Sequence, residues 1–276
     1  MKNIVVFGAN GMLGRYVCKY LSQEHSILGL TRKDLDVTDY DLNTLDVVVE
    51  NIIRGSDVVV NCLGIIKPRV DETGVSTVLV NSVFPRNLAD CCKKYNIKIY
   101  HISTDCVFSG LGRNQPYNES DIHDATDLYG KTKSLGENQN CCVIRTSIIG
   151  EEIGQSRSLI EWAKSQKGKN VKGFVNHHWN GLSCLQLSKL ISLTIKDNIY
   201  WFGVRHVFSP NIVTKFELLQ TINDVYDLDL KIEKSLANDA CYRALQTLDG
   251  DWDQYLKQNI PEIKEQIAEM KEFRLS

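Results

Sequence analysis

The first residues of the chain join a short apolar run to a glycine-rich turn, and this pattern constrains the fold most strongly. Ile4–Phe7 is continuously apolar, which is typical of a parallel strand buried on both faces. It leads into Gly8-Ala-Asn-Gly-Met-Leu-Gly14 and an amphipathic stretch. A glycine turn between strand and helix lets the backbone approach a pyrophosphate, and the helix N-terminus supplies N–H donors. The sequence therefore predicts a dinucleotide-binding turn with contacts from Gly8, Asn10, Gly11, Met12, Leu13 and Gly14.

The second apolar run indicates which dinucleotide this turn holds. Ser26–Leu30 has the pattern of a strand and is followed by Thr31-Arg32-Lys33. At this position an acidic residue would hydrogen-bond a ribose 2′-hydroxyl, whereas an arginine accommodates a 2′-phosphate. The four residues before Arg32 include no acid, so the sequence favours NADP over NAD. The residues expected at this end of the cofactor are Thr31, Arg32, Asp36 and Val37.

Strands and helices alternate through the first half of the chain, which predicts a doubly wound α/β fold of the Rossmann type with a parallel sheet. Further strands are expected at 57–64, 97–103 and 141–146, and helices at 42–53, up to about 95, and at 128–138. Ligands bind at the carboxyl ends of parallel strands. Cys62, Leu63 and Gly64, at the end of one such run, and Asn81 in the next helical region are therefore also expected near the cofactor.

The second half alternates less regularly. We expect helices near 157–167, 183–197, 214–226 and 252–272, strands near 170–175, 204–208 and 230–234, and a loop at 176–181. The polar stretch 108–127 is long for a connection, which indicates a role in substrate binding. The predicted organisation is an NADP-binding domain of residues 1–150 plus about 173–208. A smaller C-terminal substrate-binding domain would comprise about 151–172 and 209–276.

Composition excludes several classes of function. The net charge of the 276 residues is −2, so no overall basic field indicates nucleic acid or a membrane surface as a partner. The nine cysteines include no Cys-x-x-Cys pair, and we interpret them as reduced thiols of a cytoplasmic protein. His177-His178 has no third ligand nearby in the sequence, so no metal is expected. The apolar runs are too short for a signal peptide or a membrane span.

A group of proton-transferring side chains lies between residues 101 and 133. Ser103 and Thr104 end a buried strand, and Asp127 is an N-cap candidate for a helix that carries Tyr129 and Lys133. Residues four apart share one helical face. A phenol has a reference pKa of about 10, and a neighbouring cation favours the phenolate. The pattern indicates a proton donor whose pKa the lysine lowers, although Tyr-x-x-x-Lys alone also fits an exposed helix.

Taken together, the motifs resemble the extended short-chain dehydrogenase/reductases, and most closely the dTDP-4-dehydrorhamnose reductase branch. The resemblance covers residues 4 to about 150, with Trp179-Asn-Gly-Leu-Ser183 as its best later anchor. It rests on the glycine turn and on Leu35-Asp-Val-Thr-Asp39, Val59-Val-Asn-Cys62, Ile102-Ser-Thr-Asp-Cys-Val-Phe-Ser-Gly110, Pro116-Tyr-Asn-Glu119, Tyr129-Gly-Lys-Thr-Lys133, Gly136-Glu137 and Arg145-Thr-Ser147.

The resemblance implies a function and roles for individual residues. Thr104 would hydrogen-bond a substrate ketone, Tyr129 would donate the proton, and Lys133 would hold the nicotinamide ribose. The implied reaction is NADPH-dependent reduction of the C4 ketone of a UDP- or dTDP-linked 4-keto-6-deoxyhexose, in rhamnose-type deoxysugar biosynthesis. The substrate contacts expected on this basis are Ser103, Thr104, Cys106, Val107, Ile148, His178 and Trp179.

Two positions depart from the family pattern. Cys106 replaces the usual tyrosine after Ser-Thr-Asp, and Ile148 replaces the tryptophan after Arg-Thr-Ser. GDP-fucose synthase, another extended family member, has a cysteine at the same offset from its catalytic hydroxyl, where it serves in epimerisation. Cys106 therefore suggests 3-epimerisation coupled to reduction, or else is a small packing residue. The partner histidine of that enzyme would fall near Arg157-Ser158, so His177 or His178 would have to replace it.

Two other functions stay open. One alternative is a non-catalytic NADP-binding subunit, because the regulatory subunit of methionine adenosyltransferase resembles this same branch. The presence of Thr104, Tyr129 and Lys133 disfavours it. An extended-family epimerase or dehydratase would instead retain NAD, which Arg32 disfavours. The family resemblance further implies a homodimer formed through the helices near 80–94 and 128–138.

Overall fold

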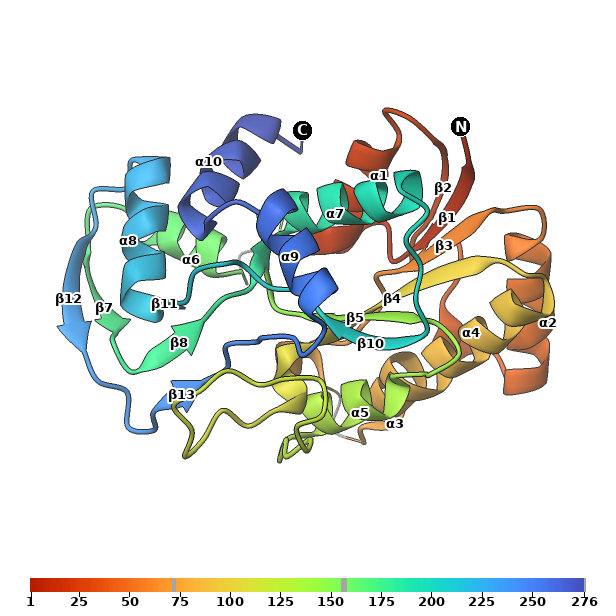
Figure 1. The fold of residues 1–276 in the computed structure, drawn as a ribbon, viewed down its shortest axis with the longest axis horizontal. Helices are drawn as coiled ribbons and strands as arrows, with labels where there is room; N and C mark the ends of the chain where they lie inside the picture. The colour runs from red at the N-terminus through yellow and green to blue at the C-terminus, as the bar shows by residue number, and fades with distance from the viewer. Residues whose placement is uncertain (71–72, 155–157, 276) are drawn as a thin grey trace. The chain divides into compact units, whose positions relative to one another are not determined.

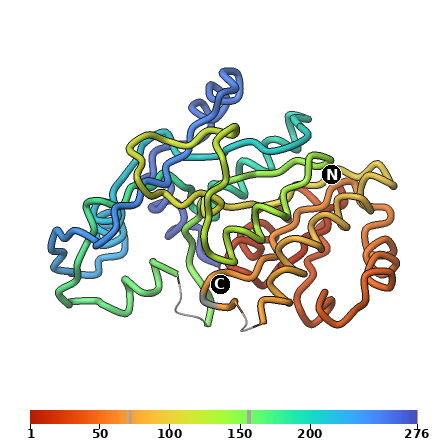
Figure 2. Tube along the Cα trace, turned by 90° about the horizontal axis from the view of Figure 1, so that it is seen from below, coloured from red at the N-terminus to blue at the C-terminus, as the bar shows by residue number. Residues whose placement is uncertain are grey.

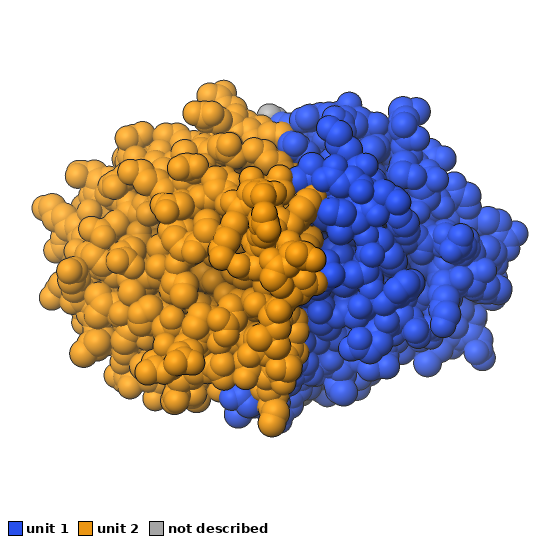
Figure 3. Space-filling model, viewed as in Figure 1, with its two compact units in different colours: residues 1–107, 123–145, 191–205 blue, residues 108–122, 146–190, 206–276 orange. Residues whose placement is uncertain are grey.

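The computed structural model describes residues 1–70, 73–154 and 158–275. The chain divides into two compact units (Figure 3). Unit 1 consists of residues 1–107, 123–145 and 191–205, and unit 2 of residues 108–122, 146–190 and 206–276. The chain therefore passes from one unit to the other several times along its length. Figure 2 shows the trace of the chain coloured by residue number.

Unit 1 contains the six-stranded sheet that the alternating pattern predicts (Figure 1). Its strands are β1 (Asn3–Phe7), β2 (Ser26–Leu30), β3 (Val58–Asn61), β4 (Lys98–Thr104), β5 (Cys142–Thr146) and β10 (Gly203–His206). They lie in the order β10-β5-β4-β3-β1-β2, and β2, β1, β3 and β4 pair in parallel. The prediction of a doubly wound parallel sheet is confirmed. The strand order reverses between β1 and β3, which is where such sheets bind ligands.

The helices of unit 1 follow the predicted positions closely. They are α1 (Met12–Leu21), α2 (Leu42–Ile53), α3 (Val75–Val78), the π-helical η3 (Leu79–Val83), α4 (Phe84–Lys94) and α5 (Leu128–Gly136). Short 3-10 turns are η1 (Val37–Asp39), η2 (Lys67–Arg69) and η4 (Asp105–Val107). The Asp127 N-cap is confirmed, because its carboxylate accepts the Gly130 N–H at 2.9 Å. Pro85 is the second residue of α4, directly after the π-helical η3.

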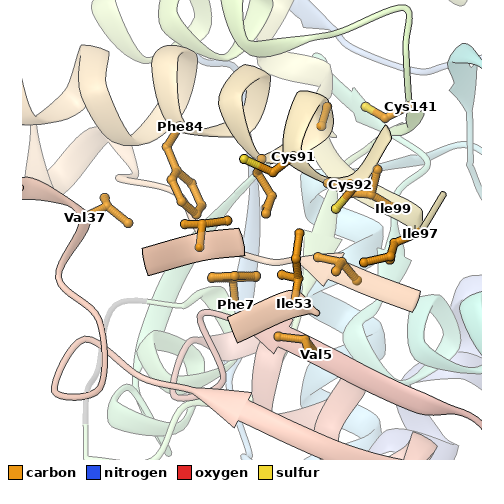
Figure 4. Close-up of a cluster of buried hydrophobic side chains, with 14 of the residues drawn as sticks. Val5, Phe7, Val37, Ile53, Phe84, Cys91, Cys92, Ile97, Ile99 and Cys141 are labelled. Atoms are coloured by element: carbon orange, nitrogen blue, oxygen red, sulfur yellow. The ribbon is translucent and has the colours of Figure 1, made fainter. Parts of the chain in front are cut away.

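The register of the sheet explains why its strands are continuously apolar. Val5, Val59 and Ile99 are paired across β1, β3 and β4, and they belong to a core that also contains Phe7 and Phe84 (Figure 4). The Phe7 and Phe84 rings meet edge to face at 5.5 Å between centroids. Residues of the opposite face are buried as well, namely Ile4, Val6, Val58 and Val60. Both faces of the sheet are therefore covered, as a parallel sheet requires.

Unit 2 is built from short strands and helices. Its elements are β6 (Ile148–Ile149), α6 (Leu159–Ser165), β7 (Asn170–Phe174), β8 (His177–Trp179), β9 (Leu182–Ser183), β11 (Val213–Thr214), α8 (Lys215–Tyr226), β12 (Lys231–Ser235), β13 (Cys241–Tyr242), α9 (Gly250–Asn259) and α10 (Ile263–Phe273). The first part of α7 (Cys184–Lys196) also belongs to it, and the part from residue 191 belongs to unit 1.

Three expectations for the second half need comment. The single helix expected at 252–272 is wrong, because Pro261 separates α9 from α10. The loop expected at 176–181 contains strand β8, which pairs with β11 and β13. The helix expected near 157–167 is α6, with residue 157 outside the described residues.

The sequence-based domain boundaries differ from the structural units at residues 108–122, 146–150, 173–190 and 206–208. The sequence places these residues with the NADP-binding domain, whereas the structure places them in unit 2. For residues 173–190 the reason is strand pairing, since β9 pairs with β6 and β8 with β11 and β13. For residues 108–122 it is the bridge between Tyr117 and Leu245. The functional roles of the two units stay predictions. Across the described ranges, no helix combines the length and hydropathy needed to cross a membrane.

The Phe7–Phe84 contact generates a prediction about stability. Phe84→Ala is expected to lower the free energy of unfolding by about 3–5 kcal/mol, because it leaves a cavity in a fully buried core. Urea denaturation followed by circular dichroism measures the change. The matched control is Val47→Ala on α2, whose side chain is 60% exposed and should change stability by less than about 0.5 kcal/mol. Equal effects of the two variants would contradict the assignment of the core.

Candidate active site

The glycine turn lies at the switch point between β1 and β3. The N–H groups of Gly8 and Ala9 donate to the Leu30 carbonyl at 3.0 and 2.9 Å, and Gly11 N–H donates to the Gly8 carbonyl at 2.9 Å. Gly11 is the N-cap of α1, and no side chain of the described residues caps this helix. A helix cannot satisfy the N–H groups of its first turn internally. Those of Met12 and Leu13 are thus suited to bind an anion, with the helix dipole in support.

Close backbone packing accounts for the glycines at both ends of this turn. A β-carbon on Gly14 would collide with the Gly8 carbonyl oxygen, and one on Gly8 would lie 3.0 Å from the Leu63 nitrogen. The turn, α1 and the segment after β3 therefore approach each other through bare backbone. This cradle fits a dinucleotide pyrophosphate, and the residues predicted from the sequence to contact it lie along it.

The polar side chains that follow β2 already have acidic partners within the chain. Arg32 is largely exposed and pairs with Asp36 at 2.5 Å between Nε and Oδ2. The Thr31 hydroxyl donates to Asp34 at 2.7 Å. Asp34 is an acidic residue two positions after Arg32. The Val37 side chain is buried in the core of unit 1, so only its backbone is available to an adenine. Arg32 is thus the residue of this group best placed to receive a 2′-phosphate, by exchanging Asp36 for it.

The segment after β3 is held by two buried asparagines. Asn81, in the π-helical η3, accepts from Ile65 N–H at 2.8 Å, and its amide donates to the Ile65 carbonyl at 2.9 Å and to Thr132 Oγ1 at 3.3 Å. Asn81 therefore ties the predicted cofactor segment to α5. A β-carbon on Gly136 would collide with the Asn81 carbonyl, so the glycine lets α5 pack directly against η3.

Asn61 links the same segment to β4. Its Oδ1 accepts from Leu63 N–H at 3.1 Å, so its Nδ2 must donate to His101 Nδ1, 3.1 Å away. The His101 proton then lies on Nε2, which is buried without a partner among the described residues. Burial, and then the Lys133 charge, lower the pKa of His101. His101 is therefore a neutral side chain within the sheet.

The three side chains expected to carry out the reaction all belong to unit 1. Thr104 ends β4, and its hydroxyl donates to the Asp105 carboxylate at 3.2 Å. The Thr104 side chain also lies close enough to the Tyr129 phenol to lower its pKa. Thr104 Oγ1 also accepts the Cys106 N–H at 3.2 Å. Lys133, one helical turn after Tyr129, donates to the Ile102 carbonyl at 2.7 Å. A hydroxyl, a phenol and an ammonium group therefore meet at the carboxyl end of β4.

Burial shifts the two titratable groups of this cluster in opposite directions. It raises the pKa of Tyr129, with a further rise from the Cys106 thiol and a partial offset from the nearby Thr104 hydroxyl. It lowers the pKa of Lys133 to about 8, against the effect of Glu137 and then Cys62. We expected Lys133 to lower the pKa of Tyr129. In the structure this pKa is raised instead, because burial disfavours the charged phenolate. The phenol therefore keeps its proton, as a donor must.

Neighbouring predicted contacts lie in different surroundings. Ser103 and Thr104 are consecutive in β4 and point to opposite faces, and the Ser103 hydroxyl donates to Glu137 at 2.6 Å. Ser103 is thereby a support of the strand end rather than a substrate contact. The Cys106 side chain is half-buried, whereas Val107 is fully buried and can offer a ligand only its backbone.

The remaining predicted substrate residues belong to unit 2. Ile148 lies in β6. The His178 ring packs on Tyr242, with 4.7 Å between centroids. Trp179 is 5% exposed, and the Lys215 ammonium group lies over its ring. Trp179 is therefore a packing residue in this structure. Within the described part of the chain, no three His, Cys, Asp or Glu side chains are grouped as a metal site requires.

Sequence reasoning missed a buried ion pair behind the cluster. Arg145 on β5 donates to Glu137 through Nε at 2.9 Å and through a terminal nitrogen at 2.6 Å. Both side chains are at most 5% exposed. The available signal was an arginine inside an otherwise apolar strand, because a buried charge requires a partner.

A doubly wound sheet with a glycine turn at its switch point and a Thr-Tyr-Lys cluster beyond β4 defines the class of extended short-chain dehydrogenase/reductases. Within this class, the chain belongs to the family described as RmlD substrate binding domain, which matches residues 1–236.

Individual relatives agree with this family. A dTDP-4-dehydrorhamnose reductase of Mycolicibacterium smegmatis is 34% identical over 49% of this chain and 40% of its own length. The spore coat polysaccharide biosynthesis protein SpsK of Bacillus subtilis is 31% identical over 84% of this chain and 82% of its own. The alignments to the first curated relatives span less than half of those proteins.

A solved structure shares the fold over the full length. It is a dTDP-4-dehydrorhamnose reductase of Bacillus anthracis in complex with NADP. Its TM-score is 0.80 at 19% identity, and the superposition covers 99% of each chain. At this level of identity the comparison supports the architecture.

The packing of the glycine turn generates a prediction. Gly14→Ala is expected to lower the free energy of unfolding by about 1–3 kcal/mol and to weaken dinucleotide binding, because its methyl group displaces the Gly8 carbonyl. Thermal unfolding and fluorescence titration with NADPH measure both effects. Gly250→Ala is the control, since a β-carbon there meets nothing within 4 Å. If Gly14→Ala bound NADPH as tightly as Gly250→Ala, the turn would not be the cofactor cradle.

Proposed function

We propose that this chain is an NADPH-dependent reductase of the C4 ketone of a dTDP-linked 4-keto-6-deoxyhexose. The observation that carries the proposal is the placement of Thr104 beside Tyr129, with Lys133 one helical turn further along α5 and bound to the Ile102 carbonyl. The printed names of the relatives support the substrate class. We assign the cofactor to unit 1 and the sugar nucleotide to unit 2.

In this proposal the bound NADPH supplies the hydride to the ketone carbon, and the chain supplies binding, orientation and a proton. Arg32 and the N-terminus of α1 hold its phosphates. Tyr129 donates its proton to the ketone oxygen as negative charge develops there, and Thr104 stabilises this oxygen by a hydrogen bond. Lys133, charged below about pH 8, holds the nicotinamide ribose and favours loss of the Tyr129 proton during the reaction.

The alternatives of a non-catalytic NADP-binding subunit and an NAD-retaining epimerase or dehydratase require different properties. A binding-only subunit has no need of the Tyr129 proton. A NAD-retaining enzyme would release NAD when the purified protein is denatured, and that result would contradict the reductase. Homodimerisation and a cytoplasmic location stay predictions.

The reductase proposal is tested by Tyr129→Phe. Wild-type protein should oxidise NADPH, and NADH less well, with dTDP-linked or UDP-linked 4-keto-6-deoxy sugars, and NMR identifies the product. Tyr129→Phe is expected to lose about 10²–10⁴-fold in kcat with little change in KM, because it lacks the donated proton. Tyr95→Phe, which removes a surface hydroxyl that bonds Glu50, is the control. Full activity of Tyr129→Phe would refute the catalytic role.

We propose 3-epimerisation as a second activity, on the basis of Cys106. Its thiol is close enough to Tyr129 to raise the pKa of the phenol, and a thiolate beside a ketone can remove the acidified proton of the adjacent carbon. Of the two positions where the partner base would fall, Arg157 lies outside the described residues and Ser158 caps α6.

The epimerisation proposal is tested by hydrogen exchange. The protein is incubated with a dTDP-linked 4-keto sugar in deuterated water without NADPH, and NMR detects deuterium at C3 or C5. We expect incorporation by the wild type and at least about tenfold less by Cys106→Ser, because a hydroxyl is a far weaker acid than a thiol. No deuterium in the wild type would exclude epimerisation and leave the reductase proposal unaffected.

A further inference from the structure

Glu137 is a buried carboxylate that directly follows α5. It accepts hydrogen bonds from the Ser103 hydroxyl at 2.6 Å and from Arg145 at 2.9 and 2.6 Å. The Arg145 terminal nitrogen also lies 2.7 Å from His123 Nε2. Burying a charged pair is costly, and it is tolerated where geometry and additional hydrogen bonds satisfy both groups. This arrangement therefore holds the Glu137 carboxylate in one position.

The first contact of Glu137 supports the end of β4. Ser103 immediately precedes Thr104, and the two side chains point to opposite faces of the sheet. A hydrogen bond that anchors Ser103 on one face therefore restrains the direction of the Thr104 hydroxyl on the other.

The second influence of Glu137 is electrostatic. Glu137 and Lys133 are four residues apart, and Glu137 opposes the effect of burial that lowers the pKa of Lys133. The Lys133 ammonium is bound on the same strand end, at the Ile102 carbonyl. Lys133 and Glu137 thus bind consecutive residues of β4, at the Ile102 carbonyl and the Ser103 hydroxyl.

The other ionisable groups around Lys133 are not negative at neutral pH. Burial raises the pKa of Cys62 and of Tyr129 and lowers that of His101, so all three are neutral. Cys62 after β3, His101 on β4, Tyr129 on α5 and Glu137 after α5 face this region, and Arg145 on β5 is paired with Glu137. Asp105 and Cys106 of η4 and Asp127 before α5 act on Tyr129. Glu137 is the carboxylate that acts on Lys133.

We propose that Glu137 is a positioning residue of the reductase site: held by Arg145, it orients Thr104 through Ser103 and keeps Lys133 in its ammonium form. The inference rests on the proposed function for its kinetic consequences. Its electrostatic part concerns the chain alone and can be tested without cofactor or substrate.

The test is a titration of Lys133 by NMR in protein labelled with carbon-13 at the lysine ε-carbon. The Lys133 signal is assigned by its absence from Lys133→Arg, and the wild-type midpoint is expected near pH 8. Glu137→Gln removes a negative charge and disfavours the ammonium form. The midpoint should therefore move down by about one pH unit, the usual scale for a neighbouring charge. An unchanged midpoint would overturn the proposal.

Two controls separate this effect from general disruption. Glu50→Gln removes a carboxylate that pairs with Lys94 on the surface of unit 1, and it should leave the Lys133 midpoint in place. If Glu137→Gln does not fold, the double variant Glu137→Met/Arg145→Met replaces the whole ion pair with apolar side chains, which buried pairs commonly tolerate. Its Lys133 midpoint should also fall, and an unchanged value would again overturn the proposal.

Kinetics separate the two roles. In Glu137→Gln, the alkaline loss of kcat/KM should begin about one pH unit lower than in the wild type. Ser103→Ala retains the charge and removes the anchor, so it should lower kcat about tenfold or more while leaving the pH profile in place. Glu137→Asp should restore the pH profile in part.

If the wild type reduces none of the sugars, the proposed function fails, whereas the NMR midpoints still decide the role of Glu137.

Discussion

Burial of the sheet on both faces is the constraint on which the rest of unit 1 depends. Strands covered on both sides carry apolar residues along their length, so polar groups concentrate where the chain leaves the sheet. Asn61, Thr104 and Arg145 all lie at or next to such strand ends. Each must then find a partner within the protein, because an unsatisfied buried polar group is costly. The candidate site consists of these polar side chains and the partners that satisfy their hydrogen bonds.

The same burial explains the electrostatic character of the site. Burial disfavours the charged form of a group. It therefore raises the pKa of Tyr129 and lowers the pKa of Lys133. Glu137 opposes the second effect, and Arg145 makes it possible to bury Glu137 at all. A phenol that keeps its proton and a lysine that stays charged suit the reductive direction of a ketone–alcohol conversion.

The sequence was most informative where one local pattern determines one local structure. The bounds of β2 and α2 and the Asp127 cap are all determined by neighbours within a few residues, and the structure agrees with them. It was least informative in unit 2, whose strands are two to five residues long and pair with distant segments. Strand β8 pairs with β11 and β13, more than 30 and 60 residues further along the chain, and no periodicity in so short a stretch can indicate such partners.

The sequence by itself determined the doubly wound fold and the glycine turn, and it predicted Thr104, Tyr129 and Lys133 as the reacting residues, because these features are encoded in short local motifs. Only the tertiary structure decided what surrounds them. It turned Ser103 away from Thr104 and bound it to Glu137, set Arg145 against the same carboxylate, and reversed the expected pKa shift of Tyr129. The physical reason is that burial and pairing are properties of a folded environment, assembled from residues that the sequence keeps apart.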